Sequence, residues 1–162
     1  MRTKDILFPI CLSAVLFSCS KKDVVGVNTA NIPIVPVTVQ NAMAYRPEAT
    51  VSTSKSAGGN IQIILSIPAG SGRTIKEITK VAANTTYTQI QSSGTSGFYT
   101  SAPIPANGLT ATFNTTLAEY VVKGPGTIPA SNTELAKRFY FLLTLDDGTQ
   151  IVTSSVRVLV LD

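Results

Sequence analysis

Apolar and polar residues alternate along several stretches of the chain. Every second side chain is apolar from Asn60 to Ile67, and a similar alternation runs from Leu109 to Leu117 and from Lys137 to Leu145. Successive side chains of a β-strand point to opposite faces, so this period of two predicts strands with one buried face. The residues expected to face inward are Ile61, Ile63, Leu65, Ile67, Leu109, Ala111, Phe113, Thr115, Leu117, Phe139, Phe141, Leu143 and Leu145.

The end of the chain has the clearest hairpin pattern. Asp146, Asp147 and Gly148 follow the third strand, and Asp and Gly tolerate the backbone angles of a tight turn. We expect a returning strand over residues 149–161, whose inward face carries Val152, Val156, Val158 and Val160.

Weaker strands lie between these runs. Residues 73–83 place Ile75, Ile78 and Val81 three apart, which also suits a helix, but the short length and the neighbouring strands favour a strand. Residues 86–91 and 98–101 are expected to form short strands.

The connection from Ala118 to Ala136 breaks the alternation. Ser131 and Glu134 have the spacing of a capping box, which predicts one helical turn through Leu135. Connections of this length are uncommon in compact domains, so this one is a candidate binding surface. The alternative is that it only bridges two sheets.

Roughly seven to eight strands spaced about ten residues apart predict an all-β fold, an antiparallel sandwich. A long connection into a Tyr-bearing strand, followed by a final hairpin, resembles immunoglobulin-like and fibronectin type III-like domains. The resemblance implies that Tyr140 is either the corner tyrosine of such folds or a surface residue of its strand.

The N-terminus has the pattern of a signal peptide. Arg2 and Lys4 precede an apolar run from Ile6 to Phe17. As a helix this run would span about 18 Å, too short for a bilayer core of about 30 Å. The segment therefore predicts secretion rather than a membrane span.

Leu16-Phe17-Ser18-Cys19 resembles the lipobox of bacterial lipoproteins. The resemblance implies cleavage before Cys19, followed by acylation of its thiol and of the new amino terminus with palmitate-type chains. The residue after Cys19 is Ser20, whereas an Asp at this position would imply retention in the inner membrane. The resemblance therefore implies that the protein is anchored in the outer membrane, at its periplasmic face or at the cell surface. The alternative is an ordinary cleavage site beside an unmodified Cys19.

Three segments follow from these patterns. Residues 1–18 are the predicted signal peptide, residues 19–41 a lipidated N-terminus and extended tether, and residues 42–162 the β-sandwich domain. Pro33 and Pro36 lack backbone donors, so the tether is expected to end at most as an edge strand packed on the domain.

The amino-acid composition excludes most kinds of catalytic site. The chain has no His, no Trp and two Cys, and its 13 basic residues are scattered among 9 acidic ones. The Ser residues have no His to activate them, and residues 54–56 are expected to form only a turn. The two adjacent Asp residues lie in another turn, so they are not a catalytic carboxylate pair. We therefore expect no catalytic residues, no metal, no cofactor and no nucleic-acid partner.

Aromatic residues are the remaining sign of recognition. Tyr87, Tyr99 and Tyr120 fall outside the strong strand patterns, and Lys123 lies close to Tyr120 in the sequence. Exposed tyrosines stack on sugars or anchor protein interfaces, although such residues more often cover the edge of a sandwich. The leading hypothesis is a non-enzymatic, lipid-anchored envelope domain that binds a protein or glycan or supports a surface complex. The alternative is a pilin-like structural subunit that assembles by strand addition.

Overall fold

The computed structural model describes residues 35–84, 90–94, 96–124 and 126–162. Chain contacts separate Met1–Asn31 from a second unit, Ile32–Asp162, which we call the body. The predicted signal peptide, Cys19 and the first part of the tether lie outside the described residues.

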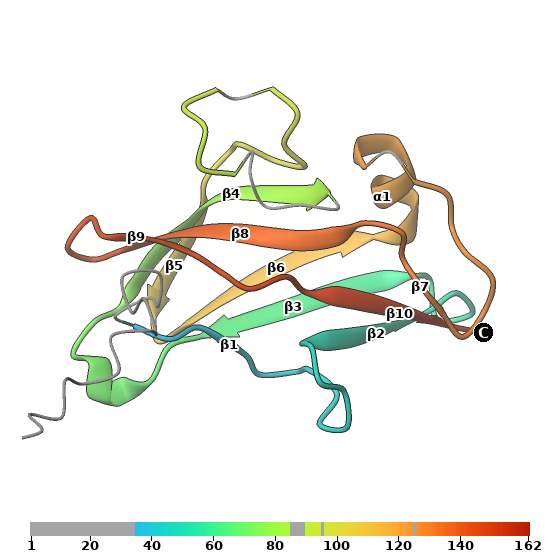
Figure 1. Ribbon diagram of the computed structural model, residues 1–162, viewed down its shortest axis with the longest axis horizontal. Helices are drawn as coiled ribbons and strands as arrows, with labels where there is room; N and C mark the ends of the chain where they lie inside the picture. The colour runs from blue at the N-terminus through green and yellow to red at the C-terminus, as the bar shows by residue number, and fades with distance from the viewer. Residues whose placement is uncertain (1–34, 85–89, 95, 125) are drawn as a thin grey trace, which may run out of the picture. The chain divides into compact units, whose positions relative to one another are not determined.

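The body is built mainly of β-strands, which confirms the all-β prediction (Figure 1). Its strands form three sheets, each named here after a central strand. The β3 sheet has the order β1 (Thr38–Val39), β3 (Asn60–Ser66), β6 (Thr110–Thr116). The β10 sheet has the order β2 (Thr50–Ser54), β10 (Arg157–Leu161), β7 (Thr133–Glu134). The β8 sheet has the order β5 (Ile104–Gly108), β4 (Ile75–Asn84), β8 (Arg138–Leu145), β9 (Gln150–Val152).

One strand pair departs from the expected antiparallel plan. β2 and β10 run parallel, with Thr50 beside Arg157 and Ser54 beside Leu161. The other strand pairs among the described residues are antiparallel. Parallel neighbours need a long connection, and here nearly the whole described chain separates the two strands. Local sequence patterns therefore cannot reveal this pairing.

The main core collects the inward side chains of all three sheets. Phe113 of β6 lies at its centre, with its ring centroid 5.4 Å from that of Phe141 and 5.9 Å from that of Tyr99. The predicted inward residues of β3, β6 and β8 are buried. Leu109 is the exception, because it precedes β6 at a corner and remains 37% exposed.

The last two strands meet β8 through an irregularity that the sequence did not reveal. Thr153 donates its backbone N–H to Phe141, and Val156 donates to Phe139. Ser154 and Ser155 together therefore lie opposite Tyr140 alone, which is a β-bulge. The bulge shifts the alternation, so the prediction that Val152 shares a face with Val156 is wrong.

A second, smaller cluster explains why β8 is buried on both faces. Ala82, Ile90, Tyr140 and Leu142 form it, with Phe98 and Val152 packed against them. Tyr140 is 5% exposed, so the alternative that it is a surface residue of its strand is wrong. Of the predicted short strands, residues 86–89 lie outside the described part, and Thr100 forms an isolated bridge with Val81.

The helical turn predicted near Ser131 is wrong. Thr133–Glu134 is the short strand β7, which pairs with β10. The helix is instead α1 (Leu117–Lys123), where the hydroxyl of Thr116 accepts the N–H of Glu119. Thr116 and Glu119 have the same capping-box spacing as Ser131 and Glu134, so only the tertiary pairing of β7 distinguishes the two sites.

Candidate functional site

The described chain enters the body at one end, and α1 lies at the other. β1 pairs with the Ser66 end of β3, whereas Thr116, just before α1, pairs with Asn60 at its opposite end. Seven residues of strand separate these ends by about 20 Å. The C-terminal Asp162 lies at the α1 end, where it accepts a hydrogen bond from Ser56 (Figure 1).

Tyr120 fixes α1 and the following connection to the core. Its side chain is fully buried, and its ring centroid lies 6.0 Å from that of Phe139. Its hydroxyl accepts the backbone N–H of Lys137 at 2.9 Å. Gly126 passes so close to the ring that a Cβ atom at this position would lie 2.6 Å from Cε1 of Tyr120. The connection therefore wraps around the tyrosine ring.

A chain of side-chain hydrogen bonds makes a second attachment. The hydroxyl of Thr115 donates to Glu119 at 2.7 Å, and its oxygen lies 2.5 Å from the hydroxyl of Tyr99. Because Thr115 has a single proton, Tyr99 is the donor in the second bond. The bond from Thr115 holds the pKa of Glu119 below its ordinary value, and Lys123 lowers it further. Burial raises the pKa of Tyr99.

These contacts change the role of the tyrosines singled out in the sequence. Tyr99 is 5% exposed and Tyr120 is fully buried, so neither ring is open to a sugar or a protein partner. Their hydroxyls satisfy groups inside the body rather than groups of a partner. Tyr87 lies outside the described residues. Lys123 does lie at the surface, where it pairs with Glu119 at 3.3 Å.

The exposed side chains in and after α1 are aliphatic rather than aromatic. Val122 is 85% exposed, Val121 42% and Ile128 44%. Leu117 and Tyr120 are three residues apart and bury one face of α1. Val122 lies three or four residues from neither of them and is on another face, whereas Val121, four residues after Leu117, borders the buried face. We call Val121, Val122, Lys123 and Ile128 the α1 surface. The sequence pattern did not single out these two adjacent valines. The 3.6-residue period of a helix is the signal that could have found them, because it sets them apart from Tyr120.

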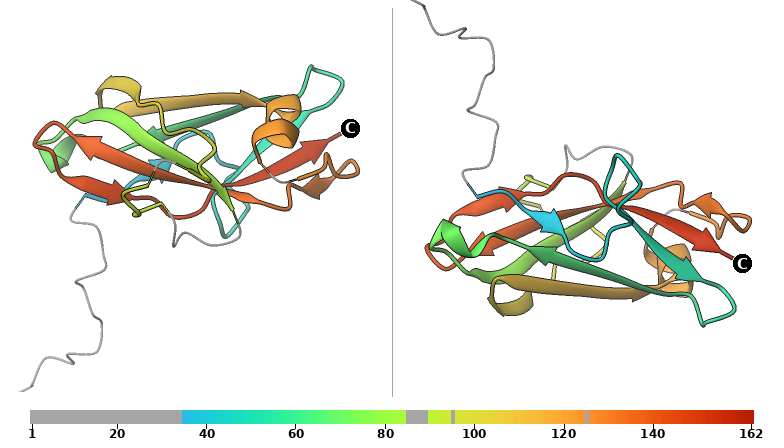
Figure 2. Two further views of the ribbon diagram at one scale, coloured as in Figure 1. Left: turned by 90° about the horizontal axis from the view of Figure 1, so that it is seen from above. Right: turned by 90° about the horizontal axis from the view of Figure 1, so that it is seen from below.

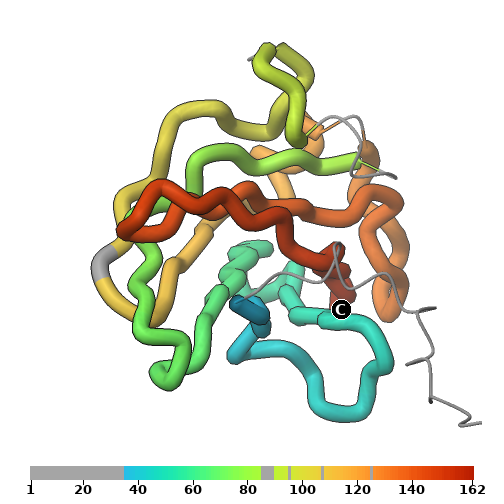
Figure 3. The backbone as a smooth tube through the Cα atoms, turned by 60° about the vertical axis from the view of Figure 1, so that its left-hand side comes forward, coloured from blue at the N-terminus to red at the C-terminus, as the bar shows by residue number. Residues whose placement is uncertain are grey.

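Tyr45 was also missed. It is 73% exposed in the connection between β1 and β2, which Figure 3 shows in cyan at the lower margin of the body. The guanidinium of Arg46 lies 5.8 Å from the centroid of its ring. Among the tyrosines that the structure describes, Tyr45 is therefore the one available to stack on a ligand.

An ion-pair cluster holds the nearby strands together. Arg157 contacts both Glu48 and Glu134, the latter at 2.6 Å, and Arg46 reaches Glu134 at 3.2 Å. The hydrogen bond from Arg157 holds the pKa of Glu48 below its ordinary value. Glu134, which the sequence placed in the candidate binding connection, is therefore committed to this cluster.

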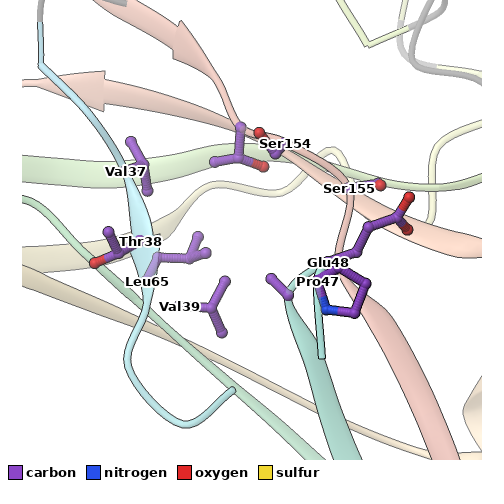
Figure 4. Close-up of a pocket in the computed structure, with 10 residues that line it drawn as sticks. Val37, Thr38, Val39, Pro47, Glu48, Leu65, Ser154 and Ser155 are labelled. Atoms are coloured by element: carbon purple, nitrogen blue, oxygen red, sulfur yellow. The ribbon is translucent and has the colours of Figure 1, made fainter. Parts of the chain in front are cut away.

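A groove of about 500 Å³ opens between β1 and the bulge (Figure 4). Val37 and Val39 lie on one side, and Ser154 and Ser155 on the segment opposite. Besides these residues, Thr38, Pro47, Glu48, Ala49, Leu65 and Thr153 line the groove. Its walls are aliphatic or hydroxyl-bearing, and its one carboxylate, Glu48, is paired with Arg157. Such a lining suits an extended peptide better than a charged small molecule.

The described residues show neither a metal-binding cluster nor a membrane-spanning helix. In the described residues, no group of three or more His, Cys, Asp or Glu side chains is placed to hold a metal. No helix in the same part of the chain is long and apolar enough to cross a membrane. Comparison with protein-family models, curated proteins and solved structures finds no match to this chain.

Proposed function

We propose that this chain is a lipid-anchored, non-enzymatic domain of the bacterial cell envelope that binds a protein partner through the α1 surface. The observation that carries the proposal is the exposure of Val122, Val121 and Ile128 at the end opposite to the entry of the chain. An anchor at the N-terminus leaves that end free to meet a partner. Exposed aliphatic residues are otherwise a cost in water.

The proposed fold is an immunoglobulin-like β-sandwich. The β3 sheet would form one layer, and the β8 and β10 sheets the other. The bridge between Phe139 and Val156 supports this joining, because it continues the pairing of β8 towards β10. The packing of side chains from all three sheets into one core supports the same arrangement.

A protein partner fits the α1 surface better than a glycan. Sugar rings are usually held by aromatic faces, and Tyr99 and Tyr120 are buried. The exposed side chains of the α1 surface are aliphatic, apart from Lys123 with its partner Glu119. Aliphatic groups gain from being covered by a matching apolar surface.

The anchor is tested by Cys19→Ala. We expect the variant to stay uncut and unacylated, because the lipoprotein pathway modifies the thiol before it cleaves. Mass spectrometry of the wild-type protein should show acyl chains on Cys19. An unmodified Cys19, or cleavage at another position, would contradict the anchor.

The partner surface is tested by a photo-crosslinking amino acid at position 122 of the full chain in intact cells. We expect one discrete product from this position and none from position 52, since Ser52 is exposed on β2 and does not belong to the α1 surface. Mass spectrometry then identifies the protein in the product. Equal labelling from both positions, or none from position 122, would contradict the proposal.

A second candidate is a structural subunit that assembles by strand addition in the groove. The bulge supports it, because Ser154 lines the groove and lies between Thr153 and Val156, whose N–H groups bond to β8. Ser154→Pro would remove one outward donor without disturbing the bonds of β8. If this candidate holds, membrane-extracted wild-type protein forms an oligomer ladder that the variant lacks. A wild-type protein without a ladder rejects it.

A further inference from the structure

β6 presents a long edge without a neighbouring strand. It pairs with β3 over seven residues without a shift in register, and no strand of the described residues lies on its other side. Both views of Figure 2 show β6 along the margin of the body. The bonds from Leu117 to Gly59 and from Ile67 to Leu109 show that odd-numbered residues of this region face β3. The N–H and C=O groups of the even-numbered residues therefore face outward, apart from the C=O of Thr116, which caps α1 and accepts the first hydrogen bond of that helix. These residues are Thr110, Thr112, Asn114 and Thr116.

This edge lacks the features that usually protect an edge strand. Natural sheets block their edges with short strands, Pro, bulges or charged side chains. The other edges of the body have such blocks: β1 and β7 are two residues long, β5 contains Pro105, and β9 runs into the bulge. Met43 and Gly59 donate to the outer side of β2. β6 has only Thr and Asn at its outward positions, so it is the long described edge that is open to pairing.

We propose that β6 pairs with β6 of a second copy of the chain, antiparallel and about a two-fold axis at Phe113. The inference rests on the proposed function and names the partner. This register places Thr110 opposite Thr116 of the second copy and Thr112 opposite Asn114. In the two 112–114 pairs the outward backbone groups of both residues meet, so each of these pairs exchanges two hydrogen bonds. In the two 110–116 pairs the C=O of Thr116 is already bonded within α1, so only the N–H of Thr116 is open to the second copy.

The side chains favour a second copy as the occupant. The facing residues are uncharged, so two identical strands meet without the repulsion that like charges would cause, and Thr–Thr pairs are favourable across a sheet. Antiparallel pairing also sets the start of one strand beside the end of the other. The exposed Leu109 of one copy then lies next to α1 of the other, with its exposed Val121 and Val122. Each copy covers apolar surface of its partner, and the two-fold symmetry closes the assembly.

Disulfide cross-linking of the full chain in intact cells tests this register. The Cα atoms of a hydrogen-bonded antiparallel pair lie about 5.5 Å apart, within the range of about 4.4–6.8 Å that a disulfide spans. Co-expressed Thr112→Cys and Asn114→Cys chains should form a mixed dimer that reduction removes. Each variant alone should cross-link far less, because identical residues are offset along the strands. Ser52→Cys, exposed on β2, is the matched control and should remain monomeric.

A charge at the edge provides an independent readout. Thr112→Lys should weaken dimerisation about tenfold or more, because it places an ammonium in the interface. Ser52→Lys adds the same charge elsewhere and should have no effect. Resistance to proteolysis shows that each variant is folded.

The outcomes separate this inference from the proposed function. A 112–114 cross-link that Thr112→Lys abolishes supports the dimer. Its absence in folded protein, or equal cross-linking at position 52, overturns the dimer. If position 122 then labels a different protein, the proposed function stands and the second copy is rejected. An open ladder of oligomers also overturns the dimer, because two-fold pairing stops at two chains.

Discussion

Tyr120→Phe removes a single oxygen atom from the core, and the structure predicts its cost. The hydroxyl of Tyr120 accepts the backbone N–H of Lys137 at 2.9 Å, and the side chain is fully buried. Phe keeps the ring that packs on Phe139 and opens almost no cavity. The change therefore isolates one hydrogen bond.

The cost follows from the group that is left behind. A buried donor without an acceptor destabilises a protein by about 1–3 kcal/mol. Against a typical free energy of unfolding of about 5–15 kcal/mol, this loss is easily measured. Tyr45→Phe is the matched control, because Tyr45 is 73% exposed and its hydroxyl contacts only the sulfur of Met43 at 3.4 Å among the described atoms. We expect the control to change stability by less than about 0.5 kcal/mol.

Urea denaturation of the wild-type chain and both variants measures the effect. The midpoint of Tyr120→Phe should fall while the slope m stays unchanged, since both proteins expose the same surface on unfolding. A loss of less than about 0.5 kcal/mol for Tyr120→Phe, or equal losses for both variants, would refute the reasoning. It would mean that the bond to Lys137 does not hold the connection in place.

Three further predictions concern stability. Gly126→Ala should destabilise the body by about 1–3 kcal/mol, measured by the same denaturation, because its Cβ would lie 2.6 Å from Cε1 of the immobile Tyr120 ring. Phe113→Ala should cost about 3–5 kcal/mol through a cavity among the aromatic rings, and a loss below about 1 kcal/mol would place Phe113 outside the core. The pKa of Glu119 is lowered in the folded state. Its contribution to the free energy of unfolding is therefore complete above its ordinary pKa of 4.5 and is lost as the pH falls through the folded-state pKa. The thermal midpoint of Glu119→Gln should therefore fall less than that of the wild type on acidification below 4.5, and identical pH profiles would contradict this.

The sequence alone determined where the main strands lie and which of their faces packs into the main core. The alternation in β3, β6 and β8 is a local property, because neighbouring side chains of a strand always point to opposite faces. The turn at Gly148, whose φ is 86°, is also local, since it depends on the backbone freedom of one residue. These features could be predicted without knowing what each segment packs against.

The tertiary structure decided which segments meet, and with them the candidate site. Tyr120 carries no mark of burial in its local sequence; it is buried because Phe139 and the connection past Gly126 close around its ring. The capping-box spacing occurs twice, at Thr116 and Glu119 and again at Ser131 and Glu134. At the second site, pairing with β10 makes Thr133–Glu134 a strand instead of a helical turn. The open edge of β6 has the same cause. A strand's own residues fix its buried face, but hydrogen bonding to distant segments fixes its neighbours, so only the folded chain shows which edge is left unpaired.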